Sequence, residues 1–344
     1  MRNLLVLFLL PVFALVSCGE TKADVKPAVV TNIQENVLPK KEGSISIHLI
    51  KTISGHRNYV FYSDFSSDSR FLATGSADRT VRIWSTETWS NLIVITNFYD
   101  EVWGIPLHYS PDNQLLAIGA YENLVLLDAM RQYSNISSVL AQKKGIQSLY
   151  IAPDGKSVIT AGVDGFLQVW RLPDLNLIQK VKAHASEVWN VCISPDGKYA
   201  LSGGEDNLAK IWTYPQLEPV QSLKYHQMPI EYVRFSHDGK KFLVASADTT
   251  TSIWKFGEWK EPLVQCKGHL GSVLVATFSM DDRFLFSGGD DDTIYVFDVA
   301  TGNMLEQLKE HYGDVMTLAV SPDGKYLVSG SRDRTIKVWE LKYE

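Results

Sequence analysis

The chain has 344 residues, of which 45% are hydrophobic and 11% aromatic, with three cysteines and a formal net charge of −6. This length and apolar content are sufficient for one large folded domain with a buried core. The acidic balance and the lack of any basic run argue against nucleic-acid binding, which needs clustered Lys and Arg. So few cysteines do not indicate a disulfide framework.

The first segment has the pattern of a targeting signal. Arg2 precedes an apolar run over residues 4–16, which is too short for a transmembrane helix and is typical of a secretory signal. The ending Leu15-Val16-Ser17-Cys18 resembles the lipobox of bacterial lipoproteins. That resemblance implies a signal peptide at residues 1–17, cleavage before Cys18 and acylation of Cys18, which anchors the protein stably in a membrane. An ordinary signal peptide that contains a cysteine is the alternative.

We therefore expect a lipoprotein of the bacterial cell envelope, in the outer membrane and facing the periplasm or the surface. Residues 18–44 are polar, contain two prolines and show little periodicity, which predicts a flexible tether after the lipidated cysteine. A random coil of this length reaches roughly 25–30 Å, enough to hold a folded domain clear of the membrane surface.

Residues 45–344 repeat one unit of about 42 residues seven times. The clearest copy runs from His311 to Glu340, and the most degenerate copy covers residues 98–128. Each copy contains short β-branched or aromatic runs, which predict strands, separated by turns such as Pro322-Asp323-Gly324. Four strands per unit at this period are typical of propeller blades.

The unit resembles the WD repeat. Gly55-His56 and Gly268-His269 match the opening Gly-His of that family, and Trp339 matches the closing Trp, although Glu340 replaces the usual Asp. The resemblance implies an all-β fold, a single seven-bladed β-propeller with four-stranded antiparallel blades. A strand is predicted at residues 45–53, before the first Gly-His, and we expect this N-terminal strand to complete the last blade and close the ring.

In this family a structural tetrad of His, Ser or Thr, Asp and Trp joins the strands of one blade by hydrogen bonds. Copy six ends on Phe297, which cannot donate one; copy three has Gln142 in place of His, and copy five has Val244 in place of Ser. Copy two lacks all four tetrad residues. The complete tetrads are His56, Thr74, Asp78 and Trp84 in copy one, His184, Ser202, Asp206 and Trp212 in copy four, and His311, Ser329, Asp333 and Trp339 in copy seven.

The sequence shows no catalytic constellation. Five of the eight histidines occupy the tetrad position, and no nucleophile elbow, His-Glu-x-x-His motif or phosphate-binding loop is present. The run Asp290-Asp291-Asp292 suggests a metal site, but its middle residue is the tetrad aspartate, so we expect no metal and no cofactor. Cys192 and Cys266 are expected to be separate apolar side chains in the core and not a pair.

The resemblance also implies where a partner binds. In WD-repeat propellers partners commonly contact the rim of the upper channel mouth, which residues near the start of each innermost strand form. Aromatic, Met and acidic residues occupy these positions, without Lys or Arg, and aromatics and Met are favoured at interface centres. The expected partner-binding residues are Tyr59, Phe61, Glu101, Trp103, Glu187, Trp189, Glu231, Asp314 and Met316.

These features predict a non-catalytic, monomeric scaffold that binds a protein or peptide of basic or neutral character through the rim, and touches the membrane only through its lipid. Two alternatives remain open. A channel-mouth hydrolase would need His108 to converge with acids such as Glu101. In a glycan-binding or cell-wall-binding module, Trp103 and Trp189 would stack on sugar rings.

Overall fold

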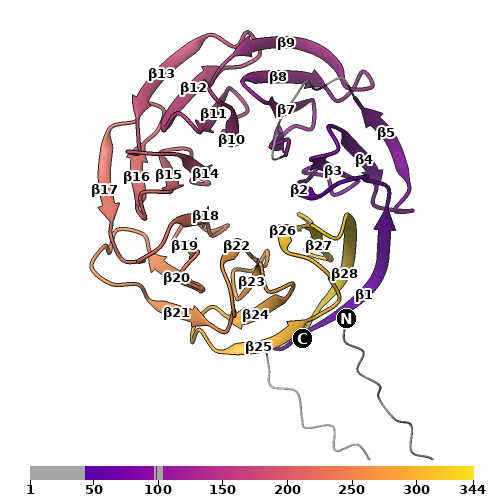
Figure 1. Cartoon of the computed structure of the whole chain (residues 1–344), viewed down its shortest axis with the longest axis vertical. Coiled ribbons are helices and arrows are strands. Elements are labelled where there is room, and N and C mark those ends of the chain that lie inside the picture. Colours follow the sequence, from indigo (N-terminus) through magenta and orange to yellow (C-terminus); the bar gives the residue numbers. More distant parts are fainter. Residues whose placement is uncertain (1–42, 97, 99–103) are drawn as a thin grey trace, which may run out of the picture. The chain divides into compact units, whose positions relative to one another are not determined.

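In the computed structural model of the protein, residues 43–96, 98 and 104–344 are described (Figure 1). Residues 43–344 form one compact unit. The expected signal peptide, the lipidation site Cys18, most of the expected tether and the rim residues Glu101 and Trp103 lie outside the described residues. None of the described residues belongs to a helix long and apolar enough to cross a membrane.

Seven four-stranded antiparallel sheets surround a central channel, which confirms the predicted seven-bladed propeller (Figure 1). The blades are numbered after the sequence copies, and each strand pairs with the next along the chain. Blade one consists of β2 (Val60–Phe65), β3 (Phe71–Ser76), β4 (Val81–Ser85) and β5 (Asn91–Ile95), and blade two of β6 (Leu107–Tyr109), β7 (Leu115–Ala120), β8 (Asn123–Asp128) and β9 (Ser134–Leu140).

The other blades have the same order from the innermost to the outermost strand. Blade three consists of β10 (Ile146–Ile151), β11 (Ser157–Gly162), β12 (Phe166–Arg171) and β13 (Leu177–Lys182), and blade four of β14 (Val188–Ile193), β15 (Tyr199–Gly204), β16 (Ala209–Thr213) and β17 (Pro219–Leu223). Blade five consists of β18 (Ile230–Phe235), β19 (Lys241–Ser246), β20 (Thr250–Lys255) and β21 (Val264–Lys267), and blade six of β22 (Val273–Phe278), β23 (Phe284–Gly289), β24 (Ile294–Asp298) and β25 (Met304–Leu308). Blade seven consists of β26 (Val315–Val320), β27 (Tyr326–Ser331), β28 (Thr335–Tyr343) and the N-terminal strand β1 (Ile45–Ser54).

The N-terminal strand closes the ring, as predicted. β1 pairs antiparallel with β28 from Ile45 opposite Tyr343 to Ser54 opposite Thr335, so both ends of the propeller belong to one blade (Figure 1). The pairing extends two residues beyond the strand, because the Gly43 N–H donates to the Glu344 carbonyl at 3.0 Å. Residues 43 and 44, expected as the end of the tether, are therefore held by the C-terminal residue.

The core lies between neighbouring blades. Every residue of β11 is buried, which matches the continuous apolar runs expected of strands that are covered on both faces. Trp212 of blade four packs in one cluster with Ile159 and Val169 of blade three, and the other blade boundaries have equivalent clusters. The outermost strands are mostly exposed; β13 has no fully buried residue. The apolar contacts therefore hold the blades to one another and fix the innermost strands around the channel.

Candidate functional site

The tetrad residues lie inside the blades. In blade one the Thr74 hydroxyl lies 2.8 Å from His56 Nε2 and accepts a hydrogen bond from Trp84 Nε1 at 2.9 Å, while His56 Nδ1 lies 2.9 Å from an Asp78 oxygen. Burial raises the pKa of Asp78, but hydrogen bonds from His56, Thr80 and a backbone N–H outweigh it and hold that pKa below its ordinary value. The same contacts join His184, Ser202, Asp206 and Trp212 in blade four, and His311, Ser329, Asp333 and Trp339 in blade seven. These side chains are bound to one another and hold each blade together.

Blade five has a complete network, although the sequence suggested that Val244 interrupts it. Ser252 supplies the missing hydroxyl, since its Oγ lies 2.7 Å from His226 Nε2 and accepts a hydrogen bond from Trp254 Nε1 at 2.8 Å. Ser252 is directly opposite Val244 in the β19–β20 pair. The expectation of an incomplete tetrad was therefore wrong, because the hydroxyl had moved to the neighbouring strand. A serine two residues before the tryptophan was the available signal.

Two other blades modify the network. In blade three Gln142 takes the place of histidine, and its Nε2 donates to the Thr160 hydroxyl at 3.0 Å, which also accepts from Trp170 Nε1 at 3.2 Å. In blade six Phe297 stacks on Tyr295, with ring centroids 6.1 Å apart. These substitutions preserve the packing of the blade without the full set of polar contacts.

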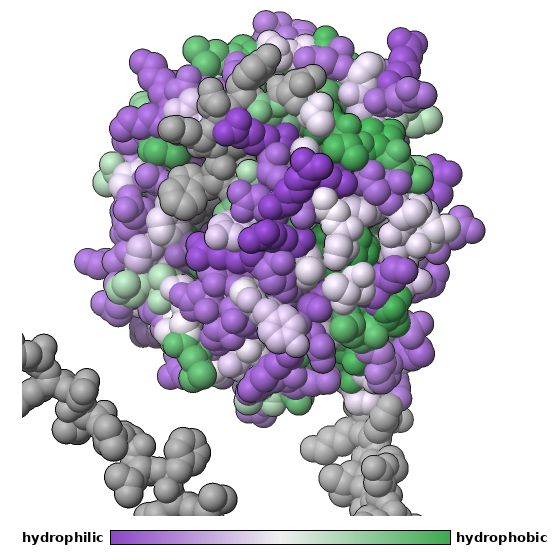
Figure 2. All heavy atoms as spheres, turned by 45° about the vertical axis from the view of Figure 1, so that its right-hand side comes forward, coloured by the Kyte–Doolittle hydropathy of each residue, from purple (hydrophilic) through white to green (hydrophobic). Residues whose placement is uncertain are grey.

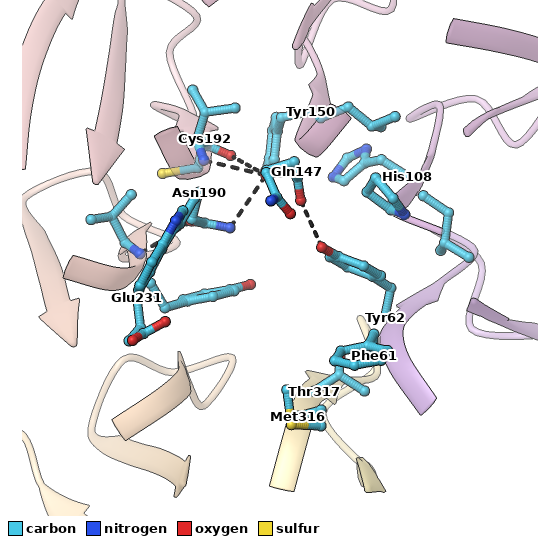
Figure 3. A pocket seen from close by; sticks show the side chains of 18 of the residues that line it. Phe61, Tyr62, His108, Gln147, Tyr150, Asn190, Cys192, Glu231, Met316 and Thr317 are labelled. Carbon is cyan, nitrogen blue, oxygen red and sulfur yellow. Dashed lines mark hydrogen bonds between the residues drawn. The ribbon is translucent and has the colours of Figure 1, made fainter. Parts of the chain in front are cut away.

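Most of the described rim residues gather at one cavity of about 490 Å³ in the central channel (Figure 3). Phe61, Glu187, Trp189, Glu231 and Met316 all line it, and all five are partly buried. They come from blades one, four, five and seven; four of them are the second residue of an innermost strand, and Glu187 directly precedes β14. Their carboxylates and apolar side chains thus share one opening, which can take an amphipathic segment.

The remaining two described rim residues lie beside a cation that sequence reasoning missed. Tyr59 is 39% exposed and packs edge to face on Phe61 with ring centroids 6.2 Å apart. Asp314 is 2.8 Å from the guanidinium of Arg332, which also lies 5.7 Å from the centre of the Tyr59 ring and lines the cavity. The expected absence of Lys and Arg from the rim was therefore wrong, because Arg332 enters it from the loop between β27 and β28.

Two carboxylates at this opening have different surroundings. Burial, followed by the charge of Asp290, raises the pKa of Glu231 to about 8, so this side chain is mostly protonated at neutral pH. Glu187 accepts hydrogen bonds from Trp189 Nε1 at 3.3 Å and from Gln147 Nε2 at 3.4 Å. The rim is therefore less negative at neutral pH than its sequence indicates.

A second set of polar residues lies deeper in the channel, three residues further along the innermost strands and thus about 10 Å below the rim. We call it the inner layer. His108 and Tyr150 lie side by side there with ring centroids 4.1 Å apart (Figure 3). The inner layer consists of Asp64, His108, Tyr150, Cys192 and Arg234, from blades one to five in order.

The inner layer has binding groups but no activated nucleophile. Burial lowers the pKa of His108 and raises those of the Cys192 thiol and the Tyr150 hydroxyl to about 12, so all three are neutral near pH 7. Cys192 and Cys266 are both buried and unpaired. In the described part of the chain, no group of three or more His, Cys, Asp or Glu side chains is arranged to hold a metal ion.

Comparison with known proteins identifies the repeat. A family model described as "WD domain, G-beta repeat" matches six segments, residues 47–85, 134–171, 175–213, 217–255, 260–298 and 302–340. The degenerate second copy lies between the first two. The chain is 30% identical over 131 residues to the human "F-box-like/WD repeat-containing protein TBL1Y". The aligned segment covers 34% of this chain and 25% of that protein.

Two further relatives show a similar extent of likeness. "Protein HIR1" of Eremothecium gossypii is 26% identical over 151 residues, which is 34% of this chain and 18% of the relative. "WD repeat-containing protein SL1-17" of Schistosoma mansoni is 26% identical over 156 residues, which is 44% of this chain and 50% of the relative. The chain thus spans half or less of the length of each of these relatives.

Proposed function

Because the chain belongs to the WD domain, G-beta repeat family, whose propellers are typically protein-interaction scaffolds, we propose that it is a non-catalytic scaffold that binds a protein or peptide partner at its upper rim. The observation that carries this proposal is the group of Phe61, Trp189 and Met316 around one opening of the channel. Aromatic and Met side chains at the centre of a concave surface are the residues that protein interfaces favour.

The charge at the opening suggests the character of the partner. Glu187 lines the opening, Asp314 nearby is paired with Arg332, and Asp290 and Asp292 lie in a loop of blade six. A segment with Lys or Arg beside apolar residues is complementary to this surface. Binding of such a segment weakens as salt rises, because the exposed charges are screened.

The rest of the described surface supports a monomeric propeller. On the face shown in Figure 2 hydrophilic residues predominate, and hydrophobic ones form separate small groups. The most exposed apolar side chains, Leu270 at 88% and Tyr312 at 89%, lie in loops of different blades. Scattered apolar residues of this kind are normal on a monomer, whereas large contiguous patches indicate an association surface.

We infer the location from the first residues of the chain. The sequence Leu15-Val16-Ser17-Cys18, with its resemblance to a lipobox, supports a lipid anchor in the bacterial cell envelope, with the outer membrane as its location. The polar segment after Cys18 would then hold the propeller clear of the membrane. In this arrangement the rim is available to a protein or peptide in the same compartment.

The proposal is tested by chemical crosslinking and pull-down of the full chain from its native membrane, with the wild type compared with the double variant Trp103→Ala/Trp189→Ala. We expect the double variant to lose one specific partner while its thermal unfolding is unchanged. Trp259→Ala is the matched control, because Trp259 packs on Phe256 away from the channel, with ring centroids 5.1 Å apart. Equal recovery of every protein with the wild type and the double variant would refute the rim as the binding surface.

A further inference from the structure

The inner layer is a cluster of polar side chains at one level of the channel. Asp64, His108, Tyr150, Cys192 and Arg234 are paired with Ala73, Ala117, Ile159, Leu201 and Leu243, which occupy equivalent places on the second strands of five successive blades. All five line the same cavity. Neither the tetrads nor the proposed rim surface involves them.

Arg234 has unused hydrogen-bonding capacity in this layer. Its guanidinium donates one hydrogen bond, from Nη1 to the Tyr232 hydroxyl at 3.3 Å, and it has no ion pair among the described residues. A guanidinium has five N–H donors, so most of those of Arg234 have no hydrogen-bond partner among the described residues, and the residue lines the cavity. The one carboxylate of the inner layer, Asp64, accepts a hydrogen bond from the Tyr109 backbone N–H at 2.8 Å.

Arg234 remains positively charged in this enclosed position. Burial lowers its pKa, but the Tyr232 and Tyr150 phenols and the Asp64 carboxylate outweigh burial and raise it above the ordinary value. A positive charge in a narrow channel is strongly favourable for an anion, because little water is present to screen it. The site therefore has a fixed cation without a bound counter-charge in contact.

One further group at this level lacks a partner. The Tyr150 hydroxyl has no hydrogen bond among the described residues, whereas His108 Nδ1 is buried away from the cavity. By contrast, the Tyr62 hydroxyl donates to the Gln147 carbonyl at 2.6 Å, so this ring forms a fixed wall (Figure 3). A guanidinium and a phenol are thus free to contact one ligand.

We propose that the inner layer binds a small organic anion, whose carboxylate or phosphate group contacts Arg234 and Tyr150. The body of the ligand lies between the aromatic rings of Tyr62, Tyr150 and Tyr232. A cavity of about 490 Å³ is in the size range of small-molecule sites, which combine apolar walls with a few convergent polar groups. Because Glu231 above it is mostly protonated, the entrance carries less repulsive charge at neutral pH.

The test measures binding of benzoate and phenyl phosphate to the purified full chain by calorimetry and by the shift in Tm. Benzamide, a neutral molecule of similar shape to benzoate, is the ligand control. We expect both anions to bind and to raise Tm, and benzamide to bind at least about tenfold more weakly, because it lacks the charge-assisted hydrogen bond. The ratio of the affinities for benzoate and phenyl phosphate distinguishes a carboxylate site from a phosphate site.

Variants assign the binding to the inner layer. Arg234→Met should lower the affinity for both anions at least about tenfold. Arg283→Met is the control, because it removes a guanidinium from an exposed turn beside Asp281, and it should leave the affinity for both anions unchanged. Tyr150→Phe keeps the ring against His108 and removes only an unpartnered hydroxyl, so it should fold normally and weaken binding. If Arg234→Met does not fold, the anion affinity of Tyr150→Phe alone tests the proposal.

Three results would overturn the proposal. These are failure of both anions to bind at about 10 mM, equal affinity for benzamide and benzoate, or unchanged anion affinity in Tyr150→Phe or in a folded Arg234→Met. The inference is independent of the rim. Loss of partner binding in the rim double variant, with anion binding retained, would separate the two sites.

Discussion

Ser252 stands directly opposite Val244 in the β19–β20 pair, and its hydroxyl occupies the place that a serine at position 244 would fill in blade five. His226 and Trp254 both contact this hydroxyl, at 2.7 and 2.8 Å. The tetrad is thus specified by the position of one oxygen atom in space and not by one position in the repeat.

This relationship predicts a rescue. Ser252→Val should lower the free energy of unfolding by about 2 kcal/mol or more, because it leaves His226 Nε2 and the Trp254 Nε1–H buried without their shared hydroxyl partner. The double variant Val244→Ser/Ser252→Val should recover most of the loss by returning the hydroxyl to the position used in blade four. Urea unfolding of the three proteins checks this, and a double variant no more stable than Ser252→Val would contradict the account of the network.

Ring closure should dominate the stability of the propeller. Deleting residues 45–53 removes the strand that pairs with β28, and we expect a large fall in Tm or the loss of cooperative unfolding, because the outer edge of β28 would be left unpaired. Deleting residues 19–42 is the control and should leave Tm unchanged. The measurement is thermal unfolding by circular dichroism; equal Tm values for the two deletions would refute closure as a main source of stability.

The buried carboxyl of Glu231 predicts a specific pH dependence. Its pKa is about 8 in the folded protein and near 4.5 in the unfolded chain, so between these values the folded state binds more protons. The contribution of Glu231 to stability therefore falls as pH rises from about 4.5 to 8. Glu231→Gln should lack this fall, and the stability difference between the variant and the wild type should grow with pH. A constant difference would show that Glu231 titrates normally.

The lipid anchor gives a separate prediction. Cys18→Ala should prevent acylation and release the protein from the membrane fraction, because the acyl chains on Cys18 are the proposed anchor. Fractionation of cells, combined with metabolic labelling by a clickable fatty acid, measures both effects. Persistent membrane association of an unlabelled Cys18→Ala protein would contradict anchoring through this residue.

The fold could be predicted almost completely from the sequence. A repeat of about 42 residues, such as the one that begins at His311, specifies the number of blades, and the unpaired strand before Gly55 specifies the closure. Ser252 could not be assigned by register, because a side chain on either of two paired strands can reach the same point. Arg332 was missed because it enters the rim from a loop, and the register of the innermost strands contains no information on that loop.

The inner layer is a second feature that could not be predicted from the sequence. Asp64, His108 and Arg234 are more than forty residues apart from one another, and their types differ from blade to blade. No single spacing marks them as a group. Only the convergence of the innermost strands, which the closed ring imposes, brings them to one cavity. Sequence reasoning singled out His108, but it could not identify the neighbours that make it part of a site.

The central claim is that the upper rim binds a protein or peptide partner, and site-specific photo-crosslinking in the native membrane tests it most directly. A photoreactive amino acid at Tyr59, which is 39% exposed on the rim, is compared with one at Leu305, which is 51% exposed on the outer strand β25. We predict a discrete covalent adduct with one protein from position 59 and none from position 305. Identical adducts from both positions, or no adduct from position 59, would contradict the claim.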